Sequence, residues 1–366
     1  MPSRAATQAA PLRTALAGGL AALALCAGAT GASAATATAT AAKTLLIAGA
    51  GDGHGVGMSQ DGADGFAEHG WSSQQILAHY YTGTTIGQAP AGTVVRVLIG
   101  SAVHRIPLER YVRGVVSAEV PSEWPAAALQ AQAIASRTYA LTAHAGGSKF
   151  DVYADTRSQV YRGAAAETPQ TNAAVAATAG QIVIYAGAPA ITYFFADSGG
   201  MTEDVQNAWP GSEPQPWLRG VSDPYDTGAQ AHWKLSLSFA TAAARLRGLI
   251  KGTFRGIEVL GRGYSPRILT AAILGTTGNT RISGDELAAR LGLQDTWAYF
   301  SVRSGAGPVK PEPDHSGRSP APATAPAPVA TPAGHQGGSA APGATASAAQ
   351  SAAGAAAAAA GGTLAG

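Results

Sequence analysis

Two kinds of charged residue stand close together in an otherwise apolar part of the chain. Between Trp124 and Ala143 the only formal charge is Arg137, and the nearest acids before it are Glu119 and Glu123. A buried guanidinium needs carboxylate or carbonyl oxygens as partners. The sequence therefore predicts an acid beside a buried base, with either Glu119 or Glu123 as the partner of Arg137.

Two helices joined by a tight corner must position these charges. Apolar side chains from Leu108 onward recur with the spacing of one helical face, and Pro121 is expected to end that helix. A second helix is expected to begin near Pro125, with Ser122 available as its N-cap. Because this helix is apolar on nearly every face, it is expected to be buried, and Arg137 with it.

A glycine-rich loop, residues 49–57, leads to a second group of polar residues. His54 lies in this loop, and Ser59 and Gln60 follow it. The glycine spacing fits neither a dinucleotide-binding loop nor a phosphate-binding loop, so no nucleotide ligand is expected. A serine hydrolase that uses Ser59 and His54 is also considered, but the pattern of a nucleophile elbow is incomplete around Ser59.

Both stretches resemble the SpoIID/LytB (stage II sporulation protein D) family. The first follows the pattern Y-x-x-G-V-V-x-x-E-M-P-x-x-W-P-x-x-A-L-x-A-Q-A-x-A-x-R-T-Y-A from Tyr111 to Ala140, with Val120 in place of the methionine. The second follows G-H-G-x-G-M-S-Q-x-G-A from Gly53 to Ala63. A third resemblance, to the family's S-S-G-G-x-T loop, lies at Ser198, Gly199 and Gly200.

The resemblance implies a lytic transglycosylase, an enzyme that cuts peptidoglycan glycan strands freed of their stem peptides. The family's catalytic glutamate falls on Glu119. One carboxyl group is enough for this reaction, because it can protonate the glycosidic oxygen and then take the proton of the sugar's own C6 hydroxyl. An apolar setting would raise the pKa of Glu119 and suit it to this role, whereas an ion pair with Arg137 would lower the pKa.

The resemblance also implies a hypothesis of another class, a non-enzymatic protein that enhances a cell-wall amidase. The same residues would then shape a glycan-binding cleft. The expected partners are peptidoglycan glycan strands and, on this second hypothesis, a cell-wall amidase. Aromatic residues after the S-G-G loop, Trp209 among them, either stack on sugar rings or pack in the core. The resemblance implies these supporting or substrate-binding residues: Arg137, Tyr139, His54, Ser59, Gln60, Gln159, Ser198, Gly199 and Gly200.

We expect neither a cofactor nor a metal. Some family members hold zinc with cysteines and a histidine, but Tyr153 and Ser158 stand in the places of those cysteines, which leaves His144 without partners. The single cysteine, Cys26, lies in the N-terminal segment and would be absent after signal cleavage. A net charge of +2 with 13% charged residues gives no sign of nucleic-acid binding.

The two ends of the chain are expected to lie outside the folded part. Residues 1–34 combine basic residues, an apolar run and an Ala-Ser-Ala cleavage site, which are the features of a secretory signal peptide. Residues 304–366 are rich in Pro, Ala, Gly and Ser, so we expect them to be disordered. Residues 35–303 are expected to form one SpoIID/LytB-like domain of a secreted protein found outside the cell or in the cell wall.

The expected fold class is α+β, with helices in the motif regions and largely antiparallel strands. In the commoner family order, the closing strand runs directly into the glycine–histidine motif. Here that motif comes first, so the chain is interpreted as circularly permuted, and strands 44–48 and 297–302 should pair. Other segments with expected structure are strands 94–99, 257–260 and 268–274, a hairpin at 181–195, and helices 59–68, 72–81 and 239–249. Capping boxes are expected at Ser72 with Gln75 and at Ser283 with Glu286, where a further helix should begin.

Overall fold

The computed structural model describes residues 43–229 and 231–305. The predicted signal peptide, residues 1–34, and nearly all of the predicted tail, residues 304–366, lie outside these ranges. The described part combines helices with mostly antiparallel strands, so the predicted α+β class is confirmed. None of its helices is long and apolar enough to cross a membrane.

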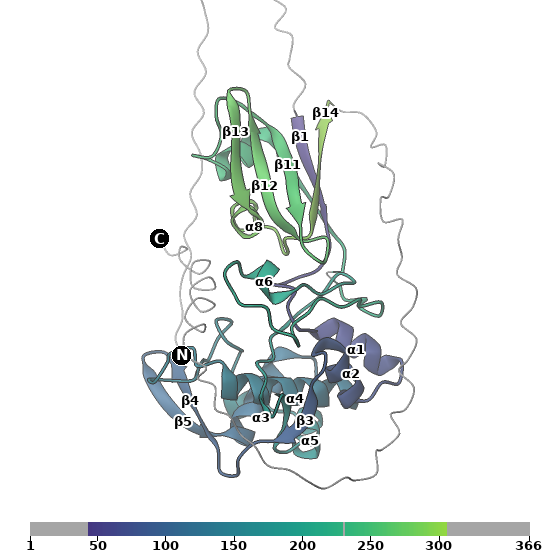
Figure 1. Cartoon of the computed structure of the whole chain (residues 1–366), viewed down its shortest axis with the longest axis vertical. Coiled ribbons are helices and arrows are strands. Elements are labelled where there is room, and N and C mark those ends of the chain that lie inside the picture. Colours follow the sequence, from purple (N-terminus) through teal and green to yellow (C-terminus); the bar gives the residue numbers. More distant parts are fainter. Residues whose placement is uncertain (1–42, 230, 306–366) are drawn as a thin grey trace, which may run out of the picture. The chain divides into compact units, whose positions relative to one another are not determined.

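The two helices predicted around the charged motif are both present. They are α3 (Leu108–Glu119) and α4 (Ala126–Thr142) (Figure 1). The apolar face of α3 is buried, and so is most of α4, including Arg137 at 0% exposure. The predicted N-cap is wrong, because α4 begins directly after Pro125 and leaves Ser122 in the preceding turn.

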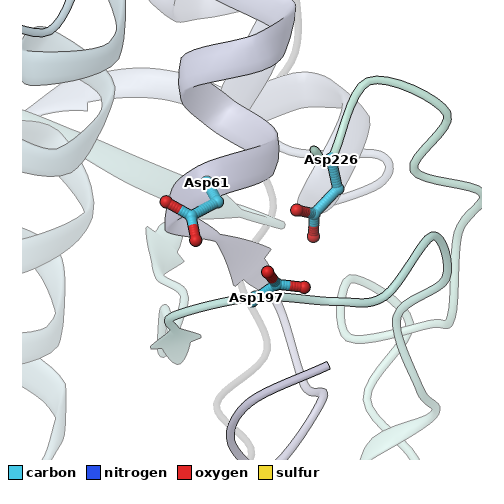
Figure 2. Close-up of side chains that lie close together, drawn as sticks. All are labelled: Asp61, Asp197 and Asp226. Atoms are coloured by element: carbon cyan, nitrogen blue, oxygen red, sulfur yellow. The ribbon is translucent and has the colours of Figure 1, made fainter. Parts of the chain in front are cut away.

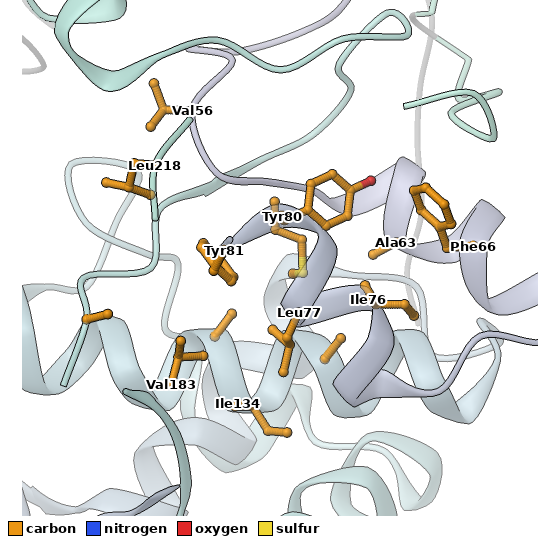
Figure 3. Packing of buried hydrophobic residues seen from close by; sticks show 14 of the residues in the cluster. Val56, Ala63, Phe66, Ile76, Leu77, Tyr80, Tyr81, Ile134, Val183 and Leu218 are labelled. Carbon is orange, nitrogen blue, oxygen red and sulfur yellow. The ribbon is translucent and has the colours of Figure 1, made fainter. Parts of the chain in front are cut away.

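Helices α1 (Gln60–Glu68) and α2 (Ser73–Tyr80) pack against α4. Both begin close to where the sequence predicts. Ser59 is the N-cap of α1, and Ser72 forms the predicted capping box with Gln75 on α2. Their apolar faces meet α4 in a first hydrophobic cluster (Figure 3). Its buried members include Val56, Phe66, Ile76, Leu77, Tyr80 and Ile134.

A second hydrophobic cluster joins α3 and α4 to α5 (Pro169–Ala177) and to strand β4 (Val94–Ile99). Strand β4 pairs antiparallel with β5 (Ala102–Pro107) and parallel with β6 (Val152–Tyr153). A short 3-10 helix at Gly163–Ala166 follows β6. Because α4 contributes to both clusters, it carries side chains into apolar surroundings on more than one face, as its composition predicts.

The predicted hairpin is present but shorter than expected. Strand β7 (Gln181–Tyr185) pairs antiparallel with β8 (Ala188–Pro189) and with β3 (Thr85–Gln88). The chain then leaves the hairpin, because Thr192 donates its hydroxyl to the carbonyl of Ala135 on α4 at 2.8 Å.

The segment after the hairpin reaches the glycine-rich loop. Strand β9 (Phe194–Phe195) pairs parallel with β2 (Met58–Ser59). The bridge between Asp52 and Asp197 continues this contact, with hydrogen bonds of 2.8 and 3.1 Å between their backbones. These pairings place the Gly-His motif beside the S-G-G loop. Helix α6 (Val205–Ala208) follows that loop.

The first strand of the described part pairs with the last. Strand β1 (Lys43–Gly49) lies between β10 (Trp233–Ser238) and β14 (Ala298–Ser304), antiparallel to both. Figure 1 shows β1 beside β14. Leu45 is opposite Val302 in this register. The predicted strand pair is therefore confirmed, while the permuted order relative to other family members stays a prediction.

A second sheet and two helices complete this region. Strand β12 (Ile268–Gly275) pairs antiparallel with β11 (Phe254–Arg262) and β13 (Gly278–Ser283). Helix α8 (Gly284–Leu291) begins at its predicted cap, Ser283. Helix α7 (Phe239–Arg245) is shorter than expected, because Gly248 takes a left-handed conformation with φ of 86°. The third hydrophobic cluster includes Leu45, Ile47, Leu237, Ile273 and Leu287.

The β1 strand gives a direct test of this core. Leu45 is 0% exposed, whereas Val302 opposite it is 46% exposed. Leu45→Ala is expected to lower the free energy of unfolding by about 2–5 kcal/mol, because it leaves a cavity in a packed cluster. Val302→Ala should change it by less than about 0.5 kcal/mol. Urea unfolding measures both, and equal effects of the two substitutions would contradict the burial of β1.

Candidate active site

Glu119 is the last residue of α3, and its side chain is partly buried. One carboxylate oxygen, Oε1, accepts a hydrogen bond from the backbone NH of Val160. The Gln60 side chain also hydrogen-bonds to this carboxyl group. Burial raises the pKa of Glu119 above its usual value, and the two hydrogen bonds reverse only part of that shift. The group therefore keeps its proton at a higher pH than an exposed glutamate does.

The start of α1 places Gln60 at this carboxyl group. The side chain of Ser59 accepts the NH of Gly62 at 3.1 Å, which fixes the first turn of the helix. Gln60 is 8% exposed, and its Nε2 atom lies 3.4 Å from Oε1 of Gln132 on α4. Gln132 in turn donates to Ser136 at 3.0 Å. The predicted site residues Glu119 and Gln60 are therefore brought together.

Gln159 fixes the loop that supplies the NH of Val160. Its side chain is 1% exposed and donates to the hydroxyl of Tyr111 at 3.0 Å and to the carbonyl of Ser136 at 3.1 Å. Gln159 thus supports the site indirectly, by holding the next residue in place for Glu119.

Tyr139 is the predicted residue that faces Glu119 from α4. Burial raises the pKa of its phenol, a hydrogen bond to Ser158 lowers it, and the charge of Glu119 raises it.

From Tyr139 a row of aromatic rings leads to the glycine-rich loop. Ring centroids are 5.9 Å apart for Tyr139 and Tyr193, 4.7 Å for Tyr193 and Trp209, and 5.0 Å for Trp209 and His54. All four side chains are partly exposed.

His54 is a neutral member of this row at neutral pH. Its Nδ1 accepts the NH of Val56 at 3.1 Å. Burial, together with the positive charge of Arg267, lowers its pKa to about 4. The hydroxyl of Ser59 is directed instead to Asp226 Oδ2 at 3.0 Å and to the carbonyl of Ala196 at 3.3 Å. Ser59 therefore serves as a helix cap, and its geometry does not favour the serine-hydrolase alternative.

Arg137 is buried as predicted, but its predicted partner is wrong. Its guanidinium makes two hydrogen bonds of 2.8 Å with the carboxylate of Glu109, in the first turn of α3. It also donates to backbone carbonyls, including that of Gln181 at 3.0 Å. Glu123 is exposed, and Glu119 lies at the other end of α3. The prediction chose the acids nearest to Arg137 in the sequence. In the structure the first turn of α3, and not its last, lies beside Arg137.

The S-G-G loop contacts the glycine-rich loop rather than Glu119. Ser198 donates its backbone NH to Asp226, and its hydroxyl accepts the NH of Gly200 at 3.0 Å. Gly199 has a φ of 68°, and a Cβ added to it would lie 2.7 Å from the backbone nitrogen of Gly51. These three predicted residues hold two loops at close approach, which explains the need for glycine.

Buried ionic groups anchor the same loop to the strands beyond it. Arg267 forms a buried ion pair with Asp295 at 2.7 Å and donates to the carbonyls of Met201 at 2.7 Å and Ser198 at 3.2 Å. The carboxylate of Glu203 accepts the hydroxyl of Ser265 at 2.6 Å.

Three acidic residues gather beside these loops, and sequence reasoning did not group them. Figure 2 shows Asp61, Asp197 and Asp226 with their carboxylates close together. Burial and the charge of Asp226 raise the pKa of Asp61 to about 6 and that of Asp197 to about 7. Asp61 stands at a variable position of the Gly-His motif, so the motif gave no signal for it.

The comparisons with known proteins agree with the motifs. Residues 100–185 match the SpoIID family model, described as "Stage II sporulation protein". Stage II sporulation protein D of Bacillus subtilis (strain 168) is 30% identical over 228 residues, which cover 57% of this chain and 64% of that protein. The Bacillus amyloliquefaciens protein of the same name is 28% identical over 243 residues, covering 62% of this chain and 68% of the relative.

A third relative has a different name. The "Amidase enhancer" of Bacillus subtilis (strain 168) is 36% identical over 127 residues, which are 35% of this chain and 17% of that protein. The match to the first relative thus spans just under two thirds of its length. Residues 100–185 thus match the SpoIID model, and the family resemblance predicted from the motifs is confirmed.

The ion pair of Arg137 gives a test of the site's framework. Arg137→Ala is expected to lower the free energy of unfolding by about 3–5 kcal/mol, because it leaves Glu109 and several buried carbonyls without their donor. Glu123→Ala, at an exposed position, should change it by less than about 0.5 kcal/mol. In a double-mutant cycle, Arg137 should couple to Glu109 and not to Glu119. Strong coupling to Glu119 would restore the original prediction.

Proposed function

We propose that this protein is a secreted, cell-wall lytic transglycosylase that cleaves peptidoglycan glycan strands with Glu119 as acid and base. The observation that carries the proposal is the setting of Glu119. Its carboxyl group is partly buried, has a raised pKa, and is held by neutral donors on Val160 and Gln60. Arg137, which would have lowered that pKa as a partner, is bound by Glu109 instead.

The proposed reaction needs only this one carboxyl group. Protonated Glu119 donates its proton to the glycosidic oxygen as the bond between that oxygen and C1 breaks. The C6 hydroxyl oxygen of the same sugar then forms a bond to C1, and its proton returns to Glu119. The products are a free hydroxyl on one fragment and an anhydro ring on the other. No water is consumed, and Glu119 ends protonated as it began.

The row of aromatic rings supports a glycan substrate. Tyr139, Tyr193, Trp209 and His54 are partly exposed and run from the neighbourhood of Glu119 to the Gly-His motif. Aromatic faces offer large apolar contact areas, and sugar rings can stack on them. His54, which is neutral at neutral pH, adds a polar, uncharged ring to this row.

A second candidate function is enhancement of a cell-wall amidase without cleavage. The relative named "Amidase enhancer", 36% identical over 127 residues, favours it. In that case the same residues would bind glycan strands and the protein would bring an amidase to them. The two functions differ in what the purified protein does alone.

Cleavage is tested with the glutamine variant of Glu119. Glu119→Gln keeps the size of the side chain and removes the transferable proton, so release of anhydro-ended products from peptide-free glycan should fall by about 100-fold or more. Glu123→Gln, an exposed neighbour, is the matched control and should retain full activity. Mass spectrometry of the digests measures both.

Two other outcomes are informative. An active Glu119→Gln variant would show that another acid is catalytic. If the unmodified protein releases nothing alone but accelerates an added amidase, the enhancer function is supported and the cleavage proposal is wrong.

The raised pKa of Glu119 also predicts a pH-dependent effect on stability. A carboxyl whose pKa is higher in the folded state than its ordinary value of about 4.3 destabilises the fold when it ionises. Glu119→Gln should therefore raise the melting temperature at pH 8, and the gain should disappear as the pH falls below about 4. Melting curves of Glu119→Gln and Glu123→Gln at both pH values test this. A gain that is equal at pH 8 and pH 4 would contradict the raised pKa.

A further inference from the structure

Three segments that are far apart in the sequence bring their acidic side chains to one point. Asp61 lies in the first turn of α1, Asp197 follows β9, and Asp226 lies in the connection before β10. One oxygen atom from each of the three carboxylates lies within 4.8 Å of the others. Figure 2 shows Asp197 facing the space between the other two.

Two of these three acidic residues are buried, and the third, Asp61, is partly exposed. Asp197 is 0% exposed and Asp226 is 8% exposed. In the described ranges, no arginine, lysine or histidine forms a salt bridge with any of the three. Burying carboxylates together is unfavourable unless a cation or hydrogen-bond donors balance their charge.

The hydrogen bonds present leave one oxygen unsatisfied. Asp226 Oδ2 accepts the hydroxyl of Ser59 and the NH of Ser198, and Asp197 Oδ1 accepts the NH of Gly199 at 2.9 Å. Asp197 Oδ2 is buried and has no hydrogen-bond partner within the described part of the chain. Asp197 and Asp226 are thus held in place through some of their oxygens, while Oδ2 of Asp197 is left without a donor among the described residues.

A glycine keeps this space free of side chains. A Cβ added to Gly228 would lie 2.4 Å from Asp197 Oδ2 and 2.2 Å from Asp61 Oδ2, so the two oxygens face the same point. Any side chain there would collide with both carboxylates. The helix dipole favours a negative charge on Asp61, which lies in the first turn of α1. It does not account for the buried oxygen Oδ2 of Asp197, which has no hydrogen-bond donor among the described residues.

We propose that Asp61, Asp197 and Asp226 bind a divalent metal ion, with calcium as the best-fitting cation. All donors are carboxylate oxygens, which suit hard cations rather than zinc or copper. Calcium accepts irregular arrangements of carboxylates and carbonyls, whereas magnesium requires a near-octahedral set. Three loops and helix ends supplying one carboxylate each form an irregular set of this kind.

The ion would act as a structural link beside the candidate active site. It would join the start of α1, the S-G-G loop and the segment around Asp226. Gln60 precedes Asp61 directly, and its side chain bonds to Glu119. Metal binding would therefore fix the position of Gln60. The proposal does not depend on whether the protein cleaves glycan, because its test measures binding.

The experiment is calorimetric titration of the metal-depleted protein, residues 35–366, with CaCl2, MgCl2, MnCl2 and ZnCl2, followed by melting curves with and without calcium. One equivalent of Ca²⁺ should bind saturably, more tightly than Zn²⁺, and raise the melting temperature. Asp197→Asn and Asp61→Asn should each weaken Ca²⁺ binding by about tenfold or more, since affinity depends on the number of ligand charges. Asp64→Asn, on the same helix but outside the cluster, should bind as the unmodified protein does.

Either of two results would overturn the proposal. In the first, none of Ca²⁺, Mg²⁺ and Mn²⁺ binds saturably up to about 10 mM. In the second, the Asp61 and Asp197 variants both bind Ca²⁺ with unchanged affinity. If Asp197→Asn fails to fold, Asp61→Asn decides the question, because Asp61 is partly exposed and its replacement should be tolerated. Tighter binding of Zn²⁺ than of Ca²⁺ would contradict the assignment to a hard cation.

Discussion

The buried guanidinium of Arg137 is the interaction on which the helical part of the structure depends. It lies on α4 and binds Glu109 at the start of α3, the carbonyl of Val175 at 3.4 Å on α5, and the carbonyl of Gln181 at 3.0 Å on β7. A cation at 0% exposure must have all of these partners at once, so it fixes four elements relative to one another. Because Arg137 pairs with Glu109, it does not pair with Glu119, which lies at the opposite end of α3.

The candidate site is built from residues that are supported indirectly. Glu119 is held by Val160, whose position depends on Gln159, and by Gln60, whose position depends on the cap at Ser59. The groups that bond to Glu119 are neutral amides, so they orient its carboxyl group without forming an ion pair with it. This arrangement combines a raised pKa with a fixed geometry, which an ion pair could not provide.

The sequence predicted what depends on local spacing. The apolar period from Leu108 and the capping residues Ser72 and Ser283 located the starts of three helices to within one or two residues. Sequence-based prediction failed where the result depends on which distant residues come into contact. The nearest acids were predicted as partners of Arg137, but its partner is Glu109. The sequence has no motif that groups Asp61 with two acidic residues from distant loops. The family resemblance included Gln60 and Gln159 among the supporting residues. It did not show that Gln60 bonds to Glu119 or that Gln159 fixes the loop that supplies the NH of Val160.

The position of β1 has a consequence for the order of folding. Strand β1 is the first element of the described chain, yet its two neighbours, β10 and β14, are synthesised long after it. Contacts between residues so far apart in sequence close a large loop and slow the search for the native state. Until β14 is complete, an apolar strand that includes Leu45 and Ile47 has at least one unpaired edge that other chains could pair with. The chain therefore remains open to aggregation through β1 until its last strand is made.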